Sequence, residues 1–123
     1  LTSDYGWRQL RGQNNFHQGL DIYGPRGEAV VAADGGEVIE VGYSSGYGKY
    51  CKIRHNEEIV TRYAHCDSIE VEEGDLVGQG FMIGTLGATG NVTGVHVHFE
   101  IIKNGKTVDP LPYMGGVELP TGW

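Results

Sequence analysis

Polar and apolar side chains alternate strictly through residues 96–101, in the stretch Gly-Val-His-Val-His-Phe-Glu-Ile-Ile that spans residues 94–102. A repeat of two is typical of a β-strand that buries one face. The face expected to enter a core carries Val97, Phe99 and Ile101. The opposite face carries His96, His98 and Glu100. At roughly 3.3 Å of rise per residue the two imidazoles lie about 6 to 7 Å apart, so one can bind a metal while the other handles a proton.

Short β-rich runs separated by glycine-containing turns continue along the chain. Residues 28–33 and 37–41 are expected to be strands, and the Asp-Gly-Gly sequence at 34–36 is a strong tight-turn signal. Residues 43–48 hold two serines and two glycines and are expected to form a loop, either a wall of a substrate cleft or a plain connection. Two further short strands are expected to bracket residues 78–80.

A hairpin is expected from residues 49–54 and 59–65. With a turn at residues 56–57, its register sets Tyr50 opposite Tyr63. One side of this hairpin, off the core, then carries Tyr50, Tyr63 and His65. The core-facing side carries Cys51, Ile53, Val60 and Ala64.

The composition indicates one all-β domain. Glycine accounts for 21 of 123 residues, about twice the usual share, which favours many turns between short strands. No stretch of ten or more residues reads as a helix, and the acidic run at 70–75 is expected to be a solvated turn. A net charge of −7 argues against a nucleic-acid partner, whose electrostatic footprint would be basic.

The ends of the chain suggest that it is part of a larger protein. It begins at Leu1 with no initiator Met and no basic-then-apolar leader, and no apolar run approaches the 18 residues of a membrane span. Residues 1–110 are expected to form the domain. Residues 111–123 lack periodicity and are expected to be a tail or linker.

A metal site is predicted from His17 and Asp21 together with the histidine strand. Glycines around this pair oppose a helix, and in a straight strand the two side chains would be about 13 Å apart. A bend at Gly19 is therefore expected to bring them together. One aspartate and two histidines form a three-ligand zinc set whose fourth position is open to water.

These blocks resemble the lysostaphin/LytM-type zinc endopeptidases that cut peptidoglycan peptides. Phe-His-Gln-Gly-Leu-Asp at 16–21 resembles the family's H-x-x-x-D, Tyr-Ala-His at 63–65 its Y-x-H, and His-Val-His-Phe-Glu at 96–100 its H-x-H-F-E. Each block alone is weak, but the three occur in order, and the resemblance runs from about residue 3 to about residue 110. It implies an antiparallel sheet with a groove along one face and the metal at its floor.

The resemblance also implies roles for individual residues. His17, Asp21 and His98 match the family's ligands for one Zn²⁺, and His96 and His65 match the two catalytic histidines. The implied activity is an endopeptidase in which water activated by zinc attacks a cross-bridge or stem-peptide bond of peptidoglycan. Its place of action would be the bacterial cell wall, for a secreted or cell-surface protein or a phage tail lysin.

The sequence leaves two interpretations open for several side chains near the site. Glu100 is either a partner that holds a ligand or a solvated carboxylate, and Tyr63 or Tyr50 either donates to the oxyanion or packs beside the site. His55 is expected to be a hydrogen-bonded structural or surface residue. Two free thiols are expected, with Cys66 as a small buried hydrophobe in place of the family's usual leucine.

Two other functional classes remain open at the level of the sequence. A domain of the same fold can be catalytically silent and serve binding or assembly. A phosphocarrier of the sugar-transport type also keeps two facing histidines, but it has no need for His17 and Asp21 at the same site.

Overall fold

The computed structural model describes residues 19–90 and 94–109, and within them the regular secondary structure is entirely β. The strands are β1 (Leu20–Tyr23), β2 (Ala29–Val31), β3 (Gly36–Ser44), β4 (Gly48–Arg54), β5 (Ile59–Cys66), β6 (Ser68–Ile69), β7 (Leu76–Val77), β8 (Met82–Thr85), β9 (His96–Lys103) and β10 (Lys106–Val108). No helix long and apolar enough to cross a membrane occurs in these residues. His17 and the 111–123 segment lie outside them.

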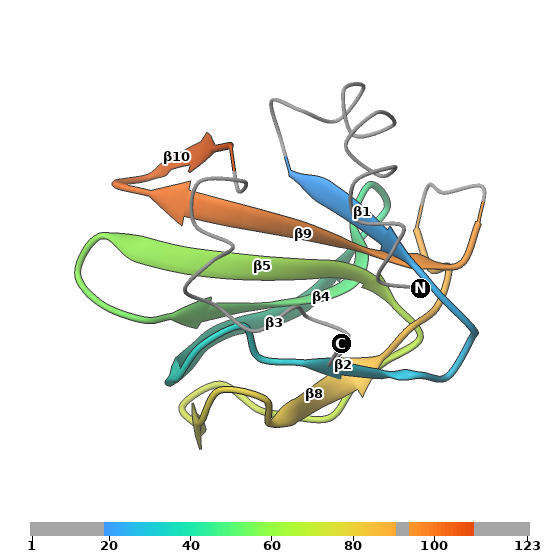
Figure 1. Ribbon diagram of the computed structural model, residues 1–123, viewed down its shortest axis with the longest axis horizontal. Coiled ribbons are helices and arrows are strands. Elements are labelled where there is room, and N and C mark those ends of the chain that lie inside the picture. The colour runs from blue at the N-terminus through green and yellow to red at the C-terminus, as the bar shows by residue number, and fades with distance from the viewer. Residues whose placement is uncertain (1–18, 91–93, 110–123) are drawn as a thin grey trace.

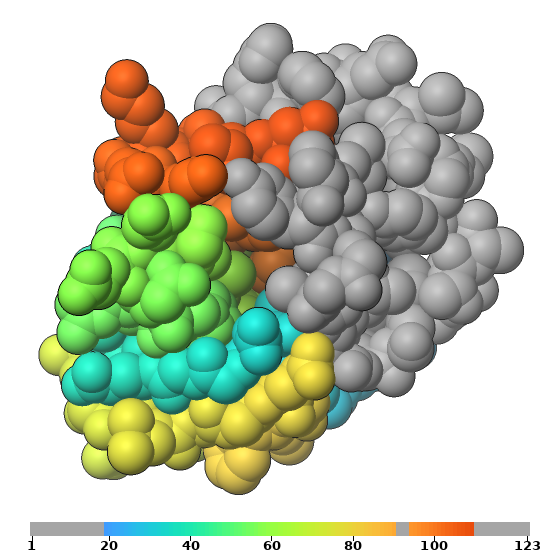
Figure 2. All heavy atoms as spheres, turned by 60° about the vertical axis from the view of Figure 1, so that its left-hand side comes forward, coloured from blue at the N-terminus to red at the C-terminus, as the bar shows by residue number. Residues whose placement is uncertain are grey.

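The strands form two antiparallel sheets. The larger has the order β1-β9-β5-β4-β3-β7, with β10 paired to the end of β9, and the smaller has the order β2-β8-β6. In Figure 1 the larger sheet curls from β1 and β9 round to β3, and β2 and β8 pass beneath it. The space-filling view follows the same succession, from β9 and β10 in orange through green and cyan to the yellow segment that contains β8 (Figure 2).

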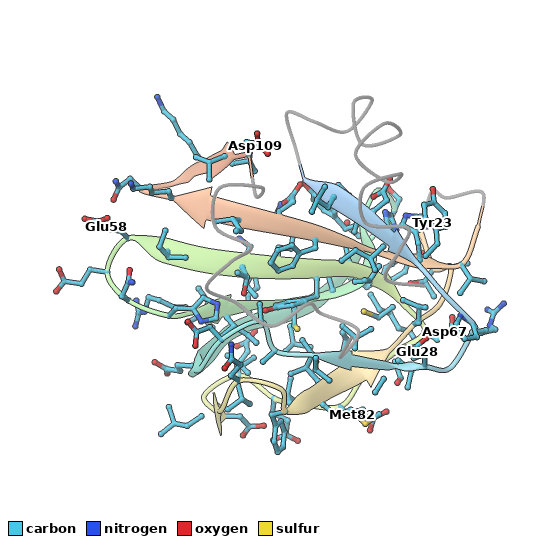
Figure 3. All side chains as sticks on the ribbon, viewed as in Figure 1. Tyr23, Glu28, Glu58, Asp67, Met82 and Asp109 are labelled. Atoms are coloured by element: carbon cyan, nitrogen blue, oxygen red, sulfur yellow. The ribbon has the colours of Figure 1, made fainter. Side chains whose placement is uncertain are left out.

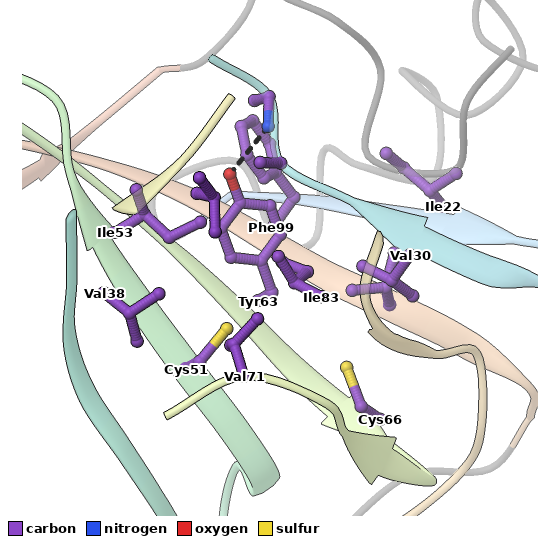
Figure 4. Packing of buried hydrophobic residues seen from close by; sticks show 14 of the residues in the cluster. Ile22, Val30, Val38, Cys51, Ile53, Tyr63, Cys66, Val71, Ile83 and Phe99 are labelled. Carbon is purple, nitrogen blue, oxygen red and sulfur yellow. Dashed lines mark hydrogen bonds between the residues drawn. The ribbon is translucent and has the colours of Figure 1, made fainter. Parts of the chain in front are cut away.

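The core lies between the two sheets and is formed by the apolar faces of their strands. Tyr63 and Phe99 are its largest members, with ring centroids 5.5 Å apart, and both are fully buried. The Tyr63 hydroxyl accepts a hydrogen bond from the Ala33 N–H at 2.9 Å, shown as the dashed line in Figure 4. This bond ties the segment after β2 to the centre of the larger sheet.

The strand predicted from the alternation is confirmed as β9. Its apolar residues, Val97, Phe99 and Ile101, enter the core. Its polar side chains are also buried, with Glu100 at 0% exposure. Glu100 is therefore not a solvated carboxylate, because other strands and loops cover the polar face.

The predicted hairpin forms, but the predicted register was wrong by one residue. Cys51, not Tyr50, lies opposite Tyr63. The cause is the turn: Asn56 Oδ1 accepts from the N–H groups of Glu58 and Ile59, at 2.8 and 2.9 Å, which closes a loop one residue longer than expected. Tyr63 therefore faces the core rather than the polar side.

The change of register reverses two further assignments. Ala64 lies opposite His98 on the polar face, and Val60 lies opposite Ile102 rather than facing the core. Cys51 and Ile53 are core residues as expected. With its hydroxyl bonded to Ala33 and to Thr61, Tyr63 packs within the core and is no oxyanion donor.

Two loop predictions are also corrected. The expected loop at 43–48 is only a turn at 45–47, because β3 runs on to Ser44 and β4 begins at Gly48. Residues 32–35 join β2 to β3, and because these strands belong to different sheets the predicted tight turn does not close a hairpin. The strands around residues 78–80 and the exposed acidic turn are confirmed.

Both cysteines are free and buried, as expected, and Figure 4 shows them in the core. Burial raises the pKa of the Cys66 thiol to about 12 and raises that of Cys51 further. His55 is a structural residue, as expected. Its Nδ1 lies 2.8 Å from the Gly35 carbonyl oxygen, and its Nε2 lies 2.7 Å from the Thr61 hydroxyl.

Candidate active site

The polar face of β9 receives its partners from β1 through strand register. Asp21 lies directly opposite His98, and Tyr23 lies directly opposite His96. Residues opposite each other in an antiparallel pair point to the same face, so the pairing delivers a carboxylate to one histidine and a tyrosine to the other. The rings of Tyr23 and His96 are 4.8 Å apart.

The Asp21 carboxylate lies close to both β9 histidines. Its Oδ1 lies 2.7 Å from His98 Nδ1 and 3.6 Å from His96 Nε2. All three side chains are largely buried. One oxygen atom thus faces two different imidazole nitrogens in a site with little access to solvent.

A second carboxylate holds the other side of the His98 ring. His98 Nε2 lies 3.0 Å from Glu100 Oε2, and Arg62, which lies opposite Glu100 on β5, forms an ion pair with Glu100. The same Arg62 nitrogen donates to the Tyr47 hydroxyl at 2.8 Å, and its guanidinium carbon lies 4.4 Å from the centre of the Tyr47 ring. Glu100 therefore holds the Nε2 side of the His98 ring, and Arg62 and Tyr47 hold Glu100 in place.

This arrangement favours positive charge at His98. Burial opposes protonation of the ring, but its hydrogen bonds to Asp21 and Glu100 outweigh burial and raise the pKa of His98 to about 9. Burial also raises the pKa values of Asp21 and Glu100, yet the neighbouring cationic groups bring both below their ordinary range. Two ionised carboxylates thus flank one imidazole.

His65 reaches the site through a β-bulge. The β4–β5 pairing shifts between Lys49 and Cys51, so β5 carries an extra residue there, and His65 has a φ of 67°. Its backbone N–H donates to the Tyr47 carbonyl at 2.7 Å. The ring consequently leaves the core side and lies 5.3 Å from the His96 ring and 6.1 Å from the His98 ring, between centroids.

His65 and His96 have the same hydrogen-bonding state, which differs from that of His98. The Nδ1 of His65 lies 2.8 Å from the Thr89 carbonyl, and that of His96 lies 3.0 Å from the Gly94 carbonyl. A carbonyl can only accept, so each Nδ1 carries the proton and each Nε2 keeps a lone pair. Burial is the main cause that lowers the pKa of both rings, which keeps them neutral and able to accept a proton at neutral pH.

The structure thus brings together Asp21, His98, His96 and His65 from the predicted set. The predicted ligand His17 lies outside the described residues, so the bend that was to join it to Asp21 stays a prediction. Gly19 has a φ of 156°, and a Cβ there would meet the Phe99 carbonyl oxygen at 2.2 Å. Only glycine fits this position beside β9.

Asp21 and His98 offer donor atoms of the kinds that zinc binds. Within residues 19–90 and 94–109, no three His, Cys, Asp or Glu side chains form a complete metal-binding group. However, Asp21 Oδ1 and His98 Nδ1 face each other, and zinc accepts carboxylate and imidazole donors. The Glu100 contact on the opposite ring nitrogen is the usual support for a metal-binding histidine.

The predicted site lacked Arg62 and Tyr47 altogether. The correct hairpin register puts Arg62 on the polar face of β5, and the separate pairing of β5 with β9 sets it opposite Glu100. Tyr47 lies in the 43–48 stretch that was expected to be either a cleft wall or a plain connection, but no local signal predicted its contacts with Arg62, which arise when the turn after β3 folds over the polar face.

Comparison with known proteins identifies the family. Residues 15–110 match peptidase family M23, and the chain belongs to this family. It is 39% identical over 98% of its length to the peptidoglycan DD-endopeptidase ShyC of Vibrio cholerae, and 40% identical over 80% of its length to the murein hydrolase activator NlpD of Salmonella typhimurium. The chain spans only 28% and 26% of these relatives.

Solved structures show the same fold. The catalytic domain of lysostaphin from Staphylococcus simulans matches with a TM-score of 0.77 and 31% identity, over 81% of this chain and 80% of that one. A zinc-containing peptidase from Vibrio cholerae matches with a TM-score of 0.74 and 40% identity, over 85% of this chain and 31% of that one. The all-β, lysostaphin-type fold expected from the sequence is thereby confirmed. The match to the M23 family replaces the hypothesis of a sugar-transport phosphocarrier.

Proposed function

We propose that this domain is a zinc-dependent endopeptidase that hydrolyses peptide bonds in bacterial peptidoglycan. The observation that supports this most strongly is the meeting of a paired Asp21 and His98 with two neutral histidines, His96 and His65, in one buried cluster. The named activities of the ShyC and lysostaphin relatives support the same reaction class. The cell envelope, where peptidoglycan lies, is the proposed place of action.

The proposed zinc ligands are His17, Asp21 and His98, one ion per chain. When bound, zinc would polarise the scissile carbonyl and make a water molecule more acidic. Glu100 and Arg62 fix the tautomer of His98, because the proton on Nε2 is held by the Glu100 carboxylate and Nδ1 is left for the metal.

The two neutral histidines supply proton transfer in this proposal. His96 Nε2 takes a proton from the attacking water as its oxygen bonds to the carbonyl carbon. That proton then passes to the leaving amine as the C–N bond breaks. His65, next to His96, has its one N–H on the Thr89 carbonyl, so its Nε2 accepts a proton and shares the proton work with His96; once protonated there it can hydrogen-bond to the developing oxyanion.

The test is the release of new amino groups from purified peptidoglycan, with and without a chelator. We expect His98→Ala to lose zinc and activity together, and His96→Ala to keep zinc while its turnover falls by about 100-fold or more. His55→Gln is the matched control, because this histidine bonds Gly35 and Thr61 away from the cluster. Full activity in His96→Ala would remove that residue from the mechanism.

A second candidate is a domain that binds at the cell wall and activates another hydrolase without cutting. The identity to NlpD, a murein hydrolase activator, favours it. The same assay separates the two candidates. An activator would release no amino groups alone and would increase release by an added peptidoglycan hydrolase.

A further inference from the structure

Thr89 bridges the two strands at the bulge that carries His65. Its hydroxyl donates to the Cys66 carbonyl and accepts from the Lys49 N–H at 3.0 Å. Lys49 and Cys66 are register partners on β4 and β5, at the edge of the bulge. One side-chain hydroxyl therefore joins the backbone groups of a strand pair that the extra residue has spread apart.

The backbone of Thr89 is held against β4 by close contacts that only glycine permits. A Cβ on Gly48 would lie 2.3 Å from the Thr89 carbonyl oxygen, and a Cβ on Gly90 would lie 2.4 Å from the Gly48 nitrogen. Both glycines have positive φ, 66° and 85°. Thr89 and Gly90, which belong to the loop that follows β8, thus pack directly against Gly48, the first residue of β4.

Asp67 anchors the start of the same loop. Its Oδ1 accepts from the Ala88 N–H at 3.4 Å, and its side chain is paired with Arg26 at 2.7 Å. Figure 3 places Asp67 at the same end of the molecule as Tyr23, which contacts His96. The loop also holds β9, because the His96 N–H donates to the Gly87 carbonyl at 3.0 Å.

We propose that Thr89 is the positioning residue of His65. Its hydroxyl closes the β4–β5 bulge and so fixes its own carbonyl where the Nδ1–H of His65 must donate. This contact selects the tautomer in which Nε2 keeps the lone pair, and it sets the plane of the ring. The consequence for catalysis rests on the function proposed above, whereas the control of the tautomer does not.

The hydroxyl is tested by Thr89→Val, which keeps the shape of the side chain, and by Thr89→Ser, which keeps the hydroxyl. With Thr89→Val we expect kcat on peptidoglycan to fall about 10- to 100-fold, KM to change less than about 3-fold and zinc content to stay at the wild-type level, because only the orientation of His65 is lost. Thr89→Ser should restore kcat to within about 3-fold of wild type. Ser68→Ala is the matched control, since it removes a hydrogen-bonded hydroxyl on the smaller sheet.

The second readout is the His65 tautomer, from ¹⁵N–¹H correlation spectra of histidine-labelled protein with His65 assigned by its substitution. Wild type should show Nδ1 protonated and Nε2 unprotonated, and Thr89→Val should show a mixture. Should Thr89→Val fail to fold, Thr89→Ala removes the same hydroxyl without bulk and is read in the same way.

Two results would overturn the proposal: an unchanged His65 tautomer in a folded variant without the hydroxyl, or an unchanged kcat in that variant. If wild type proves inactive on every peptidoglycan, the proposed function fails, but the tautomer spectra still decide what Thr89 does.

Discussion

Replacing Glu100 by glutamine tests whether a carboxylate behind His98 is needed for metal binding. Glu100→Gln keeps the size of the side chain and leaves an oxygen that can accept from His98 Nε2. It removes the negative charge that pairs with Arg62. Both partners are largely buried, with side-chain exposures of 15% for Arg62 and 1% for Glu100.

The expected magnitudes follow from this burial. Removing one partner of a buried ion pair costs about 3–5 kcal/mol, and we expect about 3 kcal/mol because Arg62 keeps its contacts with Tyr47. For a domain of this size that lowers Tm by about 10 °C. Zinc affinity should fall about 10-fold or more, the usual effect of losing the partner of a metal-binding histidine.

Thermal unfolding of the chelator-treated protein and competitive zinc titration measure the two effects separately. Adding Arg62→Met removes the unpaired charge and should recover most of the lost stability, but it should not recover zinc affinity. Glu37→Gln is the control, because this carboxylate pairs with Arg54 at 3.6 Å and not with a residue of the cluster. Zinc affinity within about 3-fold of wild type in Glu100→Gln would refute the reasoning.

Three further outcomes are expected. Burial lowers the pKa values of His65 and His96, so each ring stays neutral to a lower pH than an ordinary imidazole does. The acid limb of kcat/KM should therefore have its midpoint below the ordinary imidazole value of about 6.5, and a midpoint above it with zinc retained would contradict this. Gly48→Ala should lower the free energy of unfolding by at least about 2 kcal/mol in denaturant titrations, and clearly more than Gly74→Ala, which has a similarly positive φ but no atom within 4 Å of the added Cβ. The two buried thiols should not react with a thiol reagent until the protein unfolds, and rapid reaction of the native protein would show that the core is open.

Local periodicity was enough to predict the strand that carries the candidate site. The alternation along β9 correctly assigned Phe99 to the core and His98 to the polar face, because a strand has only two faces. The all-β class followed equally well from glycine-rich turns and the lack of helical periodicity.

The register of the β4–β5 hairpin could not be read from the same pattern. It depends on the side chain of Asn56 closing the turn and on a bulge whose extra residue is His65. The prediction put His65 off the core by simple alternation with Tyr63. In the structure Tyr63 is in the core and His65 leaves it through a positive φ.

Contacts between distant segments were the other gap. Thr89 and Tyr47 come from loops with no periodic signal, and their roles appear only when each loop is seated beside β5. The sequence motif supplied the histidines, but the groups that fix their orientation are backbone carbonyls and a buried ion pair.

The central claim is tested most directly by measuring zinc content and amino-group release on the same preparation of the domain, before and after chelation and after zinc is restored. We expect about one zinc per chain, release of amino groups from peptidoglycan that stops on chelation, and recovery when zinc returns. One zinc per chain without amino-group release from any peptidoglycan, or release that continues unchanged after the metal is removed, would contradict it.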